Sequence, residues 1–323
     1  DEALKRVDQV TFLACGTASY VGLVAKYLWQ QWLKLPIAVE IGSEFRYSHP
    51  HLTPDSLVVT VSQSGETADT LESMRLANQL GAKTLGVVNV MGSTVTREAH
   101  GTLYIHAGPE ICVASTKAFT AQMTVLTLLG LYLAQLHGTL PPERARGTLD
   151  ALAQAPRLVR QVLQQEPAIE ALAQRFFDVD NFLYLGRDVL FPIALEGALK
   201  LKEISYIHAE GYPAGELKHG PIALVDEHMP VVVLITKNSV YDKVLSNVAE
   251  VKARKGIVIA ITDEVNEDVA RVADHLIEVP ATDKALTPLL FTVPVQLLAY
   301  HIAVLRGTDV DQPRNLAKSV TVE

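Results

Sequence analysis

The chain has 323 residues, which is long for a single core and comfortable for two domains. Hydrophobic residues make up 49% of it and charged residues 20%, a balance typical of a well-packed globular protein that excludes a largely disordered one. The formal net charge of −8 excludes a general nucleic-acid-binding surface, which needs a basic excess.

No basic-then-apolar leader is visible, so a secretory signal is not expected. A long uncharged run, Pro288–Leu305, contains Pro294 and His301 and is shorter than the roughly 20 apolar residues of a membrane span. It therefore predicts a buried core helix and no membrane contact. Cys15 and Cys112 have no metal-ligand spacing, so we expect a cytoplasmic protein without a metal site.

Apolar, β-branched runs alternate with helix-length segments along the chain. The first set of predicted strands is Val10–Ala14, Ile37–Ile41, Ser56–Val61, Thr84–Val90 and Thr102–Ile105. The second set is Asn181–Leu185, Pro230–Thr236, Gly256–Ile261 and His275–Val279. Most are continuously apolar, which is typical of parallel strands covered on both faces. Helical segments such as Thr67–Leu80 and Tyr241–Lys255 separate them, so the pattern predicts an α/β fold of βαβ units.

The two sets resemble each other in order. The segment TFLACGTASY (11–20) corresponds to NFLYLGRDVL (181–190), and each half ends with a long apolar helix. We therefore predict a duplicated domain, with Pro141–Pro142 and the helical stretch 143–165 as the connector. The expected boundaries are 1–140 for the first domain, 141–308 for the second and 309–323 for a C-terminal tail.

The run VSQSGET follows the third predicted strand. At the carboxyl end of a parallel strand, a turn into a helix presents free N–H groups that favour an oxyanion. Ser62, Ser64 and Thr67 add hydroxyl donors, and Gly65 lets the backbone approach a ligand. No Walker lysine follows, which argues against a nucleoside triphosphate. The alternative is that these residues only cap a helix beginning near Glu66.

A second hydroxyl cluster, Ser115 and Thr116 in CVASTKAFT, also precedes a helix and has the same two interpretations. The corresponding turn of the second half, ITKNSVYD, lacks the serine pattern. One phosphate site per chain is therefore expected.

The helix IALEGALKLKEISY carries a polar stripe on an apolar body. Glu196, Lys200 and Glu203 are spaced i, i+4 and i+7, so they share one helix face. A solvated ladder worth about 0.3–0.5 kcal/mol per pair is the usual meaning of this spacing. Because the flanks are apolar nearly all round, we expect the stripe to face a cleft, where a carboxylate beside a lysine serves proton transfer.

Two further segments carry chemistry with open interpretations. The Gly/Pro-punctuated stretch 209–224 is predicted to be a loop, and its His219 is either a surface residue or a placed acid–base group. The chain closes on NLAKSVTVE, in which Lys318 is either a solvated charge on a fraying terminus or an amine held at a site.

Taken together, the motifs CGTAS, SEFRY, SQSGETADT, VASTKAF, ALEGALKLKEISYIHAE, GELKHGP and DQPRNLAKSVTVE resemble the isomerase part of the glucosamine-6-phosphate synthase family. The resemblance covers essentially the whole chain. It implies two flavodoxin-like sugar isomerase (SIS) domains, each a parallel sheet flanked by helices, and a C-terminal tail docked on the active site. The family normally adds an N-terminal glutaminase domain, whose motifs are not in this sequence.

The resemblance also implies the activity: fructose-6-phosphate is converted to glucosamine-6-phosphate without a cofactor, in a homodimer. The residues implied to bind the sugar phosphate are Ser62, Gln63, Ser64 and Thr67, with Thr17, Val113, Ser115 and Ala317 nearby. One position departs from the family pattern. Ala18 stands where the family commonly has serine, and Ser19 follows, so one hydroxyl contact is lost or displaced.

The catalytic roles are likewise implied by the resemblance. Glu203 is the base that moves a proton between C1 and C2. His219, acting from the partner subunit, opens the sugar ring. Lys318 forms a Schiff base with the C2 ketone, and Lys200 and Glu196 support the site. A stand-alone sugar-phosphate isomerase or deaminase and a non-catalytic sugar-phosphate sensor are the alternatives.

Overall fold

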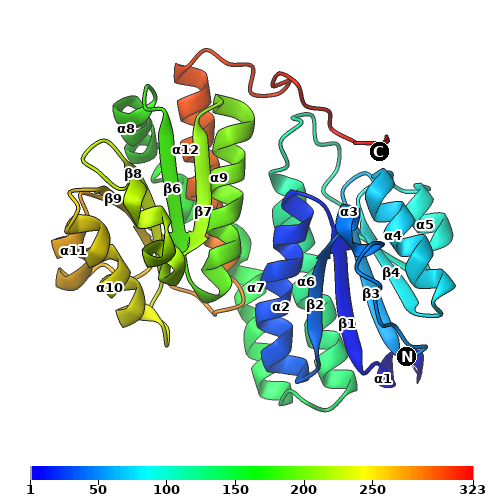
Figure 1. Cartoon of the computed structure of the whole chain (residues 1–323). Coiled ribbons are helices and arrows are strands. Elements are labelled where there is room, and N and C mark those ends of the chain that lie inside the picture. Colours follow the sequence, from blue (N-terminus) through cyan, green and yellow to red (C-terminus); the bar gives the residue numbers. More distant parts are fainter. Residues whose placement is uncertain (1, 323) are drawn as a thin grey trace. The chain divides into compact units, whose positions relative to one another are not determined.

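The computed structural model describes residues 2–322 and separates into two units, each built on one parallel sheet (Figure 1). The first unit runs to Leu149 and takes in the chain again from Ala317 onward. The second unit is Asp150–Leu316. The helix α7 (Pro142–Leu163) carries the chain from one to the other.

The first unit has a five-stranded sheet in the order β2-β1-β3-β4-β5, with all pairs parallel. Its strands are β1 (Gln9–Ala14), β2 (Ile37–Ile41), β3 (Ser56–Ser62), β4 (Lys83–Val88) and β5 (Gly101–Tyr104). Its helices are α1 (Glu2–Lys5), α2 (Thr17–Leu33), α3 (Gly42–Phe45), α4 (Ala68–Gln79), α5 (Thr94–Glu98) and α6 (Lys117–Leu136). This strand order is that of flavodoxin-like folds.

The second unit repeats the plan, since its sheet order β10-β9-β8-β6-β7 is the same sequence of crossovers. Its strands are β6 (Asn181–Gly186), β7 (His208–Pro213), β8 (Pro230–Ile235), β9 (Ile257–Thr262) and β10 (His275–Glu278). Its helices are α8 (Glu166–Phe176), α9 (Phe191–Ser205), α10 (Tyr241–Lys252), α11 (Glu267–Val272) and α12 (Thr287–Leu305), with short 3-10 turns at Asp188–Leu190, Ala214–His219 and Pro221–Leu224. The predicted α/β duplication is confirmed.

The predicted loop 209–224 is wrong in its first part. His208–Pro213 is the strand β7, and two 3-10 turns follow it. β7 pairs with β6 along its whole length, from Asn181 opposite His208 to Gly186 opposite Pro213. Pro213 is tolerated because β7 is an edge strand, where a missing N–H breaks no ladder.

Close packing of α2 on α6 covers one face of the first sheet. The indole of Trp29 is fully buried and donates a hydrogen bond from Nε1 to the Leu126 carbonyl at 3.0 Å. Gly130 makes this approach possible, since a Cβ there would overlap the indole. α4 contacts the other side of the sheet through β3 and β4, so both faces are covered, as the apolar strands require.

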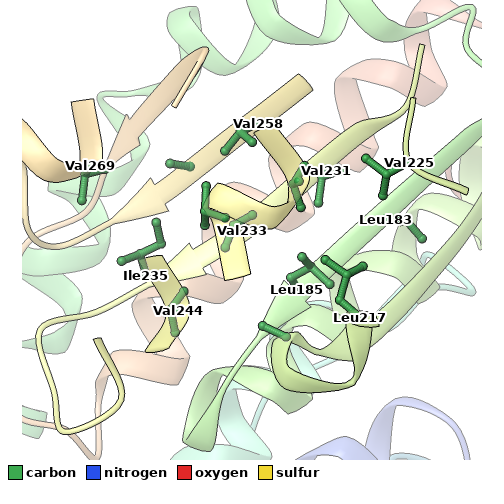
Figure 2. Packing of buried hydrophobic residues seen from close by; sticks show 14 of the residues in the cluster. Leu183, Leu185, Leu217, Val225, Val231, Val233, Ile235, Val244, Val258 and Val269 are labelled. Atoms are coloured by element: carbon green, nitrogen blue, oxygen red, sulfur yellow. The ribbon is translucent and has the colours of Figure 1, made fainter. Parts of the chain in front are cut away.

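In the second unit, the strands β6, β8 and β9 give their side chains to one continuous apolar cluster (Figure 2). Leu185, Val233 and Val258 are fully buried in it, and Val244 of α10 closes it from outside the sheet. On the opposite face, α12 packs against α8 and α9, as predicted for the long uncharged run.

Two of the described helices, α6 and α12, are long and apolar enough to cross a membrane by length and composition alone. More than half of each apolar stretch is buried inside the protein, 56% for α6 and 67% for α12.

Candidate functional site

A cavity of about 120 Å³ lies in the first unit, at the carboxyl ends of β1 and β3. These strands are neighbours at the point where the strand order reverses, which is where open α/β sheets bind ligands. Eight predicted site residues line it: Thr17, Ser62, Gln63, Ser64, Thr67, Val113, Ser115 and Lys318.

The serine turn between β3 and α4 is shaped by its own hydroxyls. Ser62 Oγ accepts a hydrogen bond from Gly65 N at 3.0 Å, and Ser64 Oγ accepts one from Glu66 N at 3.2 Å. Thr67 is the N-cap of α4, but its side chain makes no capping hydrogen bond, and the helix begins at Ala68, within two residues of the predicted start. Simple helix capping therefore does not account for this cluster.

Gly65 is required by the turn's geometry. Its φ is +67°, in the left-handed region that favours glycine. A Cβ at this position would also overlap the hydroxyl of Ser93. The backbone can therefore double back tightly at the end of β3.

The second hydroxyl cluster precedes α6, where Thr116 is the N-cap, again without a capping side-chain hydrogen bond. The cap comes from Glu110, which the sequence did not suggest. Its Oε1 accepts from the backbone N–H groups of Thr116 at 2.8 Å and Ala118 at 3.1 Å. A carboxylate at a helix N-terminus is favoured by the helix dipole.

The end of the chain contributes Lys318 to this cavity. Its Nζ lies 2.6 Å from Glu110 Oε2 and 3.5 Å from the carbonyl oxygen of Val113. Next to it, Ser319 Oγ donates to Ser64 Oγ at 3.1 Å, and Ala68 N donates to the carbonyl of Val320 at 3.1 Å. Docking of the tail on a bound sugar stays a prediction.

Burial strongly affects Glu110, whose side chain is 2% exposed, against 26% for Lys318. Burial alone raises the pKa of the Glu110 carboxyl. The hydrogen bonds from Lys318, Thr116 and Ala118 outweigh that effect and hold this pKa below its ordinary value. Glu110 is therefore an anion facing the amine.

The structure shows what Ala18 and Ser19 do at the position where the sequence departs from the family pattern. Ala18 lines the cavity, so a methyl group stands where the family has a hydroxyl. Ser19 is buried and donates its hydroxyl to the Gly16 carbonyl at 2.7 Å, so it does not replace the lost contact. Ala317 is exposed and does not line the cavity.

Four residues that the sequence did not single out as site members also line the cavity: Cys15, Thr70, Gln122 and the apolar Val61. Gln122 is 1% exposed, and its Oε1 has no hydrogen-bond partner within the described part of the chain. Its signal in the sequence was an amide within the apolar stretch of α6.

The polar stripe of α9 belongs to the second unit. The side chains of Glu196 and Lys200 are 0% and 2% exposed, so a solvated ladder is excluded for them. Lys200 Nζ lies 3.5 Å from Glu196 Oε1 and 2.5 Å from Glu203 Oε2. Glu203 is the most accessible of the three, at 21%.

The charge state of Lys200 follows from these contacts. Burial by itself lowers the pKa of the ammonium, but the two carboxylates outweigh it and raise this pKa above its ordinary value. Lys200 therefore stays a cation and is a poor nucleophile. The role of Glu203 as a base stays a prediction.

His219 ends the 3-10 turn Ala214–His219 and is exposed within the chain. Its action on a partner subunit stays a prediction. In the same unit, Arg314 of the tail stacks its guanidinium on the Tyr206 ring, 4.2 Å from the centroid. The backbone N–H of Arg314 donates to the Tyr206 hydroxyl at 2.9 Å.

The turn after β8 in the second unit has a different chemistry. Thr236 Oγ1 donates to Asp263 Oδ2 at 2.6 Å, and Lys237 N donates to Asp263 Oδ1 at 3.1 Å. The carboxylate of Asp263 thus accepts the hydrogen bonds that this turn could otherwise donate to a ligand. Across residues 2–322, no group of three or more His, Cys, Asp or Glu side chains could hold a metal ion.

Comparison with known proteins gives the family. The SIS domain family matches residues 3–132 and 175–306, one stretch in each unit. The chain is 54% identical, over 99% of its length, to the glutamine–fructose-6-phosphate aminotransferase (isomerizing) of Thermus thermophilus and covers 53% of that protein. It is 51% identical, over 100% of its length, to the enzyme of the same name from Chlorobaculum tepidum, covering 52%.

A solved structure is similar to this chain in both sequence and fold. The C-terminal domain of glucosamine-fructose-6-phosphate aminotransferase from Francisella tularensis is 42% identical, with a TM-score of 0.92 over 97% of this chain and 89% of that one. The chain spans about half the length of the curated relatives it matches.

Proposed function

This chain belongs to the SIS domain family, as a pair of domains like the C-terminal part of glucosamine-fructose-6-phosphate aminotransferases, and we propose that it carries their isomerase activity. Fructose-6-phosphate and ammonia enter the reaction, and glucosamine-6-phosphate leaves it. In the complete enzyme a glutaminase domain supplies the ammonia. The active form is a cytoplasmic homodimer.

One observation carries the proposal: a primary amine, Lys318, lines the same cavity as the serine turn. Hydroxyls and N–H groups at the end of a parallel strand suit a phosphate, and an amine suits the carbonyl carbon of a ketose. A sensor that only binds sugar phosphate has no need of the amine or of the buried charges on α9.

The phosphate anchors the substrate. Ser62, Gln63, Ser64 and Thr67 hold it, and Thr17 and Ser115 bind sugar hydroxyls. This binding is the same in the ground state and the transition state, so it contributes by fixing the position of C1 and C2. Val113 forms part of the wall of the site, and Ala317 lies in the tail beside the sugar.

The chemistry uses the amine and one carboxylate. The nitrogen of Lys318 bonds to C2 of the open-chain ketose, the C2 oxygen leaves as water, and an iminium forms. The iminium makes the C1 proton acidic, and Glu203 carries that proton from C1 to C2, converting ketose to aldose. Before this proton transfer, ammonia adds to C2 of the iminium and the Lys318 amine leaves, so the C2 iminium nitrogen now comes from ammonia and becomes the amino group of the product. Lys200 and Glu196 hold Glu203 in position.

Ring opening precedes this step and needs an acid–base group. His219 fills that role from the partner subunit, which agrees with its exposure within one chain. The tail that carries Lys318 argues against a stand-alone sugar-phosphate isomerase or deaminase. The agreement of the aminotransferase relatives over the whole chain favours the synthase reaction.

Reductive trapping tests the proposal directly. Chain saturated with fructose-6-phosphate is treated with borohydride, digested and examined by mass spectrometry. The sugar mass is expected on Lys318, because hydride reduces the iminium to a stable secondary amine. A Lys318→Ala chain and unphosphorylated fructose serve as controls. Unmodified Lys318 in the sugar-saturated sample would remove its proposed role.

A further inference from the structure

Glu110 is a buried carboxylate that the proposed reaction does not yet use. It lies in the connection between β5 and α6, and its side chain is 2% exposed. Its closest cation is Lys318, 208 positions away in the sequence, with the oxygen and nitrogen 2.6 Å apart. A buried carboxylate in hydrogen-bond contact with a lysine in a cavity is a frequent arrangement for proton transfer.

The two oxygens of Glu110 have different partners. Oε1 receives the backbone N–H groups of Thr116 and Ala118, at 2.8 and 3.1 Å, so the first turn of α6 fixes the carboxylate in place. Oε2 faces Lys318 Nζ. One oxygen therefore holds the group rigidly, while the other is directed at the atom that reacts in the proposed function.

We propose that Glu110 is the catalytic base that takes a proton from the Lys318 ammonium and so generates the nucleophilic amine. This inference rests on the proposed function, in which Lys318 attacks C2. It supplies a step that the reaction needs, because an ammonium has no lone pair with which to attack a carbonyl.

The step balances without any further reactant. One N–H bond of the ammonium breaks, its proton moves to Glu110 Oε2, and the freed lone pair forms the bond to C2. The second proton lost from nitrogen goes to the former ketone oxygen. Glu110 then returns its proton to that hydroxyl, which leaves as water, and the carboxylate is restored.

The surroundings favour such a reversible transfer. While the ammonium is present, its charge and hydrogen bond help to keep Glu110 ionised. Once the nitrogen is neutral, that support is lost, and burial favours the protonated acid. Cys15 is the other titratable side chain lining the cavity within the described residues, and its Sγ lies 3.5 Å from Thr70 Oγ1.

The test compares Glu110→Gln with the wild-type chain in single-turnover trapping by cyanoborohydride, from about pH 7 to about pH 11. The amide oxygen can still accept the N–H groups of α6, but the amide cannot take a proton. Trapping at pH 7 is expected to fall about 100-fold, in line with the loss of a general base. The deficit should shrink toward pH 11, where lysine loses its proton to solvent.

Glu98→Gln is the matched control. Glu98 is a carboxylate of the same unit that pairs with Arg75 at 2.7 Å, whereas Glu110 pairs with Lys318. Its loss should leave the trapping rate unchanged at every pH. Half-saturation by fructose-6-phosphate should also be the same in all three chains, because Glu110 is not among the residues that line the cavity.

The outcomes separate the two proposals. Absence of trapping in the wild-type chain overturns the proposed function. Wild-type trapping with an equal or faster Glu110→Gln rate at pH 7 overturns the role of Glu110 alone, and so does a deficit that stays constant with pH. If Glu110→Gln does not fold, Glu110→Asp replaces it. Its carboxylate is one methylene shorter, and trapping as fast as in the wild-type chain would contradict the inference.

Discussion

The same turn has opposite chemistry in the two halves of this protein. After β3, in the first unit, the turn presents serine and threonine hydroxyls to a cavity. After β8, at the matching strand of the second unit, the hydroxyl of Thr236 and the N–H of Lys237 are taken by Asp263. Both sheets have the same strand order, so the difference does not come from topology.

The comparison teaches that side chains, and not the strand order, decide what the donors of this turn bind. In the second unit they bind an internal carboxylate, that of Asp263. In the first unit Glu66 lies in the turn, but its carboxylate accepts from Thr94 N and Oγ1 at 2.8 Å and not from the turn. The buried charges of the second unit lie elsewhere, on α9.

The largest expected effect tests whether the second unit supplies the proton transfer. Glu203→Gln should lower isomerisation about 10²- to 10⁴-fold, because an amide cannot carry the proton between C1 and C2. Binding of fructose-6-phosphate should be retained. Steady-state rates and calorimetric binding measure the two quantities, with the exposed Glu267→Gln as the control. A near-normal rate would remove Glu203 as the base.

A smaller effect is expected for the serine turn itself. Ser64→Ala removes a hydroxyl donor that lines the cavity, so binding of fructose-6-phosphate should weaken about tenfold, as for a hydrogen bond to a charged group. Unphosphorylated fructose should be unaffected. The control is Thr236→Val at the matching turn, which should leave sugar binding unchanged. Equal weakening for both sugars would argue against a phosphate site.

The smallest effect concerns Asp263. Burial raises the pKa of this carboxyl, against the opposing hydrogen bonds from Thr236 and from Lys237 N. Between the ordinary and the raised pKa, the folded protein holds a proton that the unfolded chain has released. The resulting stabilisation is present below the ordinary pKa of about 3.9 and is lost as pH rises through the raised one.

Asp263→Asn removes this dependence. The melting temperature of the wild-type chain minus that of the variant should therefore decrease as pH rises from about 3.5 to about 6, with a change within about 4 °C. Thermal unfolding followed by circular dichroism measures it. The exposed Asp178→Asn is the control, and a difference that grows with pH would contradict the assignment.

Much of the fold could be predicted from the residues because its strands are buried on both faces. Continuous apolar runs such as Val231–Leu234 leave few other structures open, and the strands of both sheets were predicted with one exception. That exception, β7, is an edge strand containing Gly211 and Pro213. Its strand conformation depends on pairing with β6, which local propensity does not report.

The candidate site likewise has residues that local sequence patterns predict and others that they do not. Hydroxyls at a strand end and a charged stripe on an apolar helix are local patterns, and the burial of Glu196 and Lys200 agrees with the predicted stripe. Glu110 left no local signal, since a single glutamate in a loop is ordinarily a surface residue. Its partner, Lys318, lies 208 positions further along the chain.

By itself, the sequence determined the two parallel sheets, their duplication and the positions of the hydroxyls and charges, because burial and periodicity act over a few neighbouring residues. Only the tertiary structure decided which of these groups meet. It brought Lys318 against Glu110, and it placed Asp263 against the donors of the turn after β8. The reason is physical: hydrogen bonds and ion pairs depend on distances in space, and folding alone sets those distances for residues far apart in the chain.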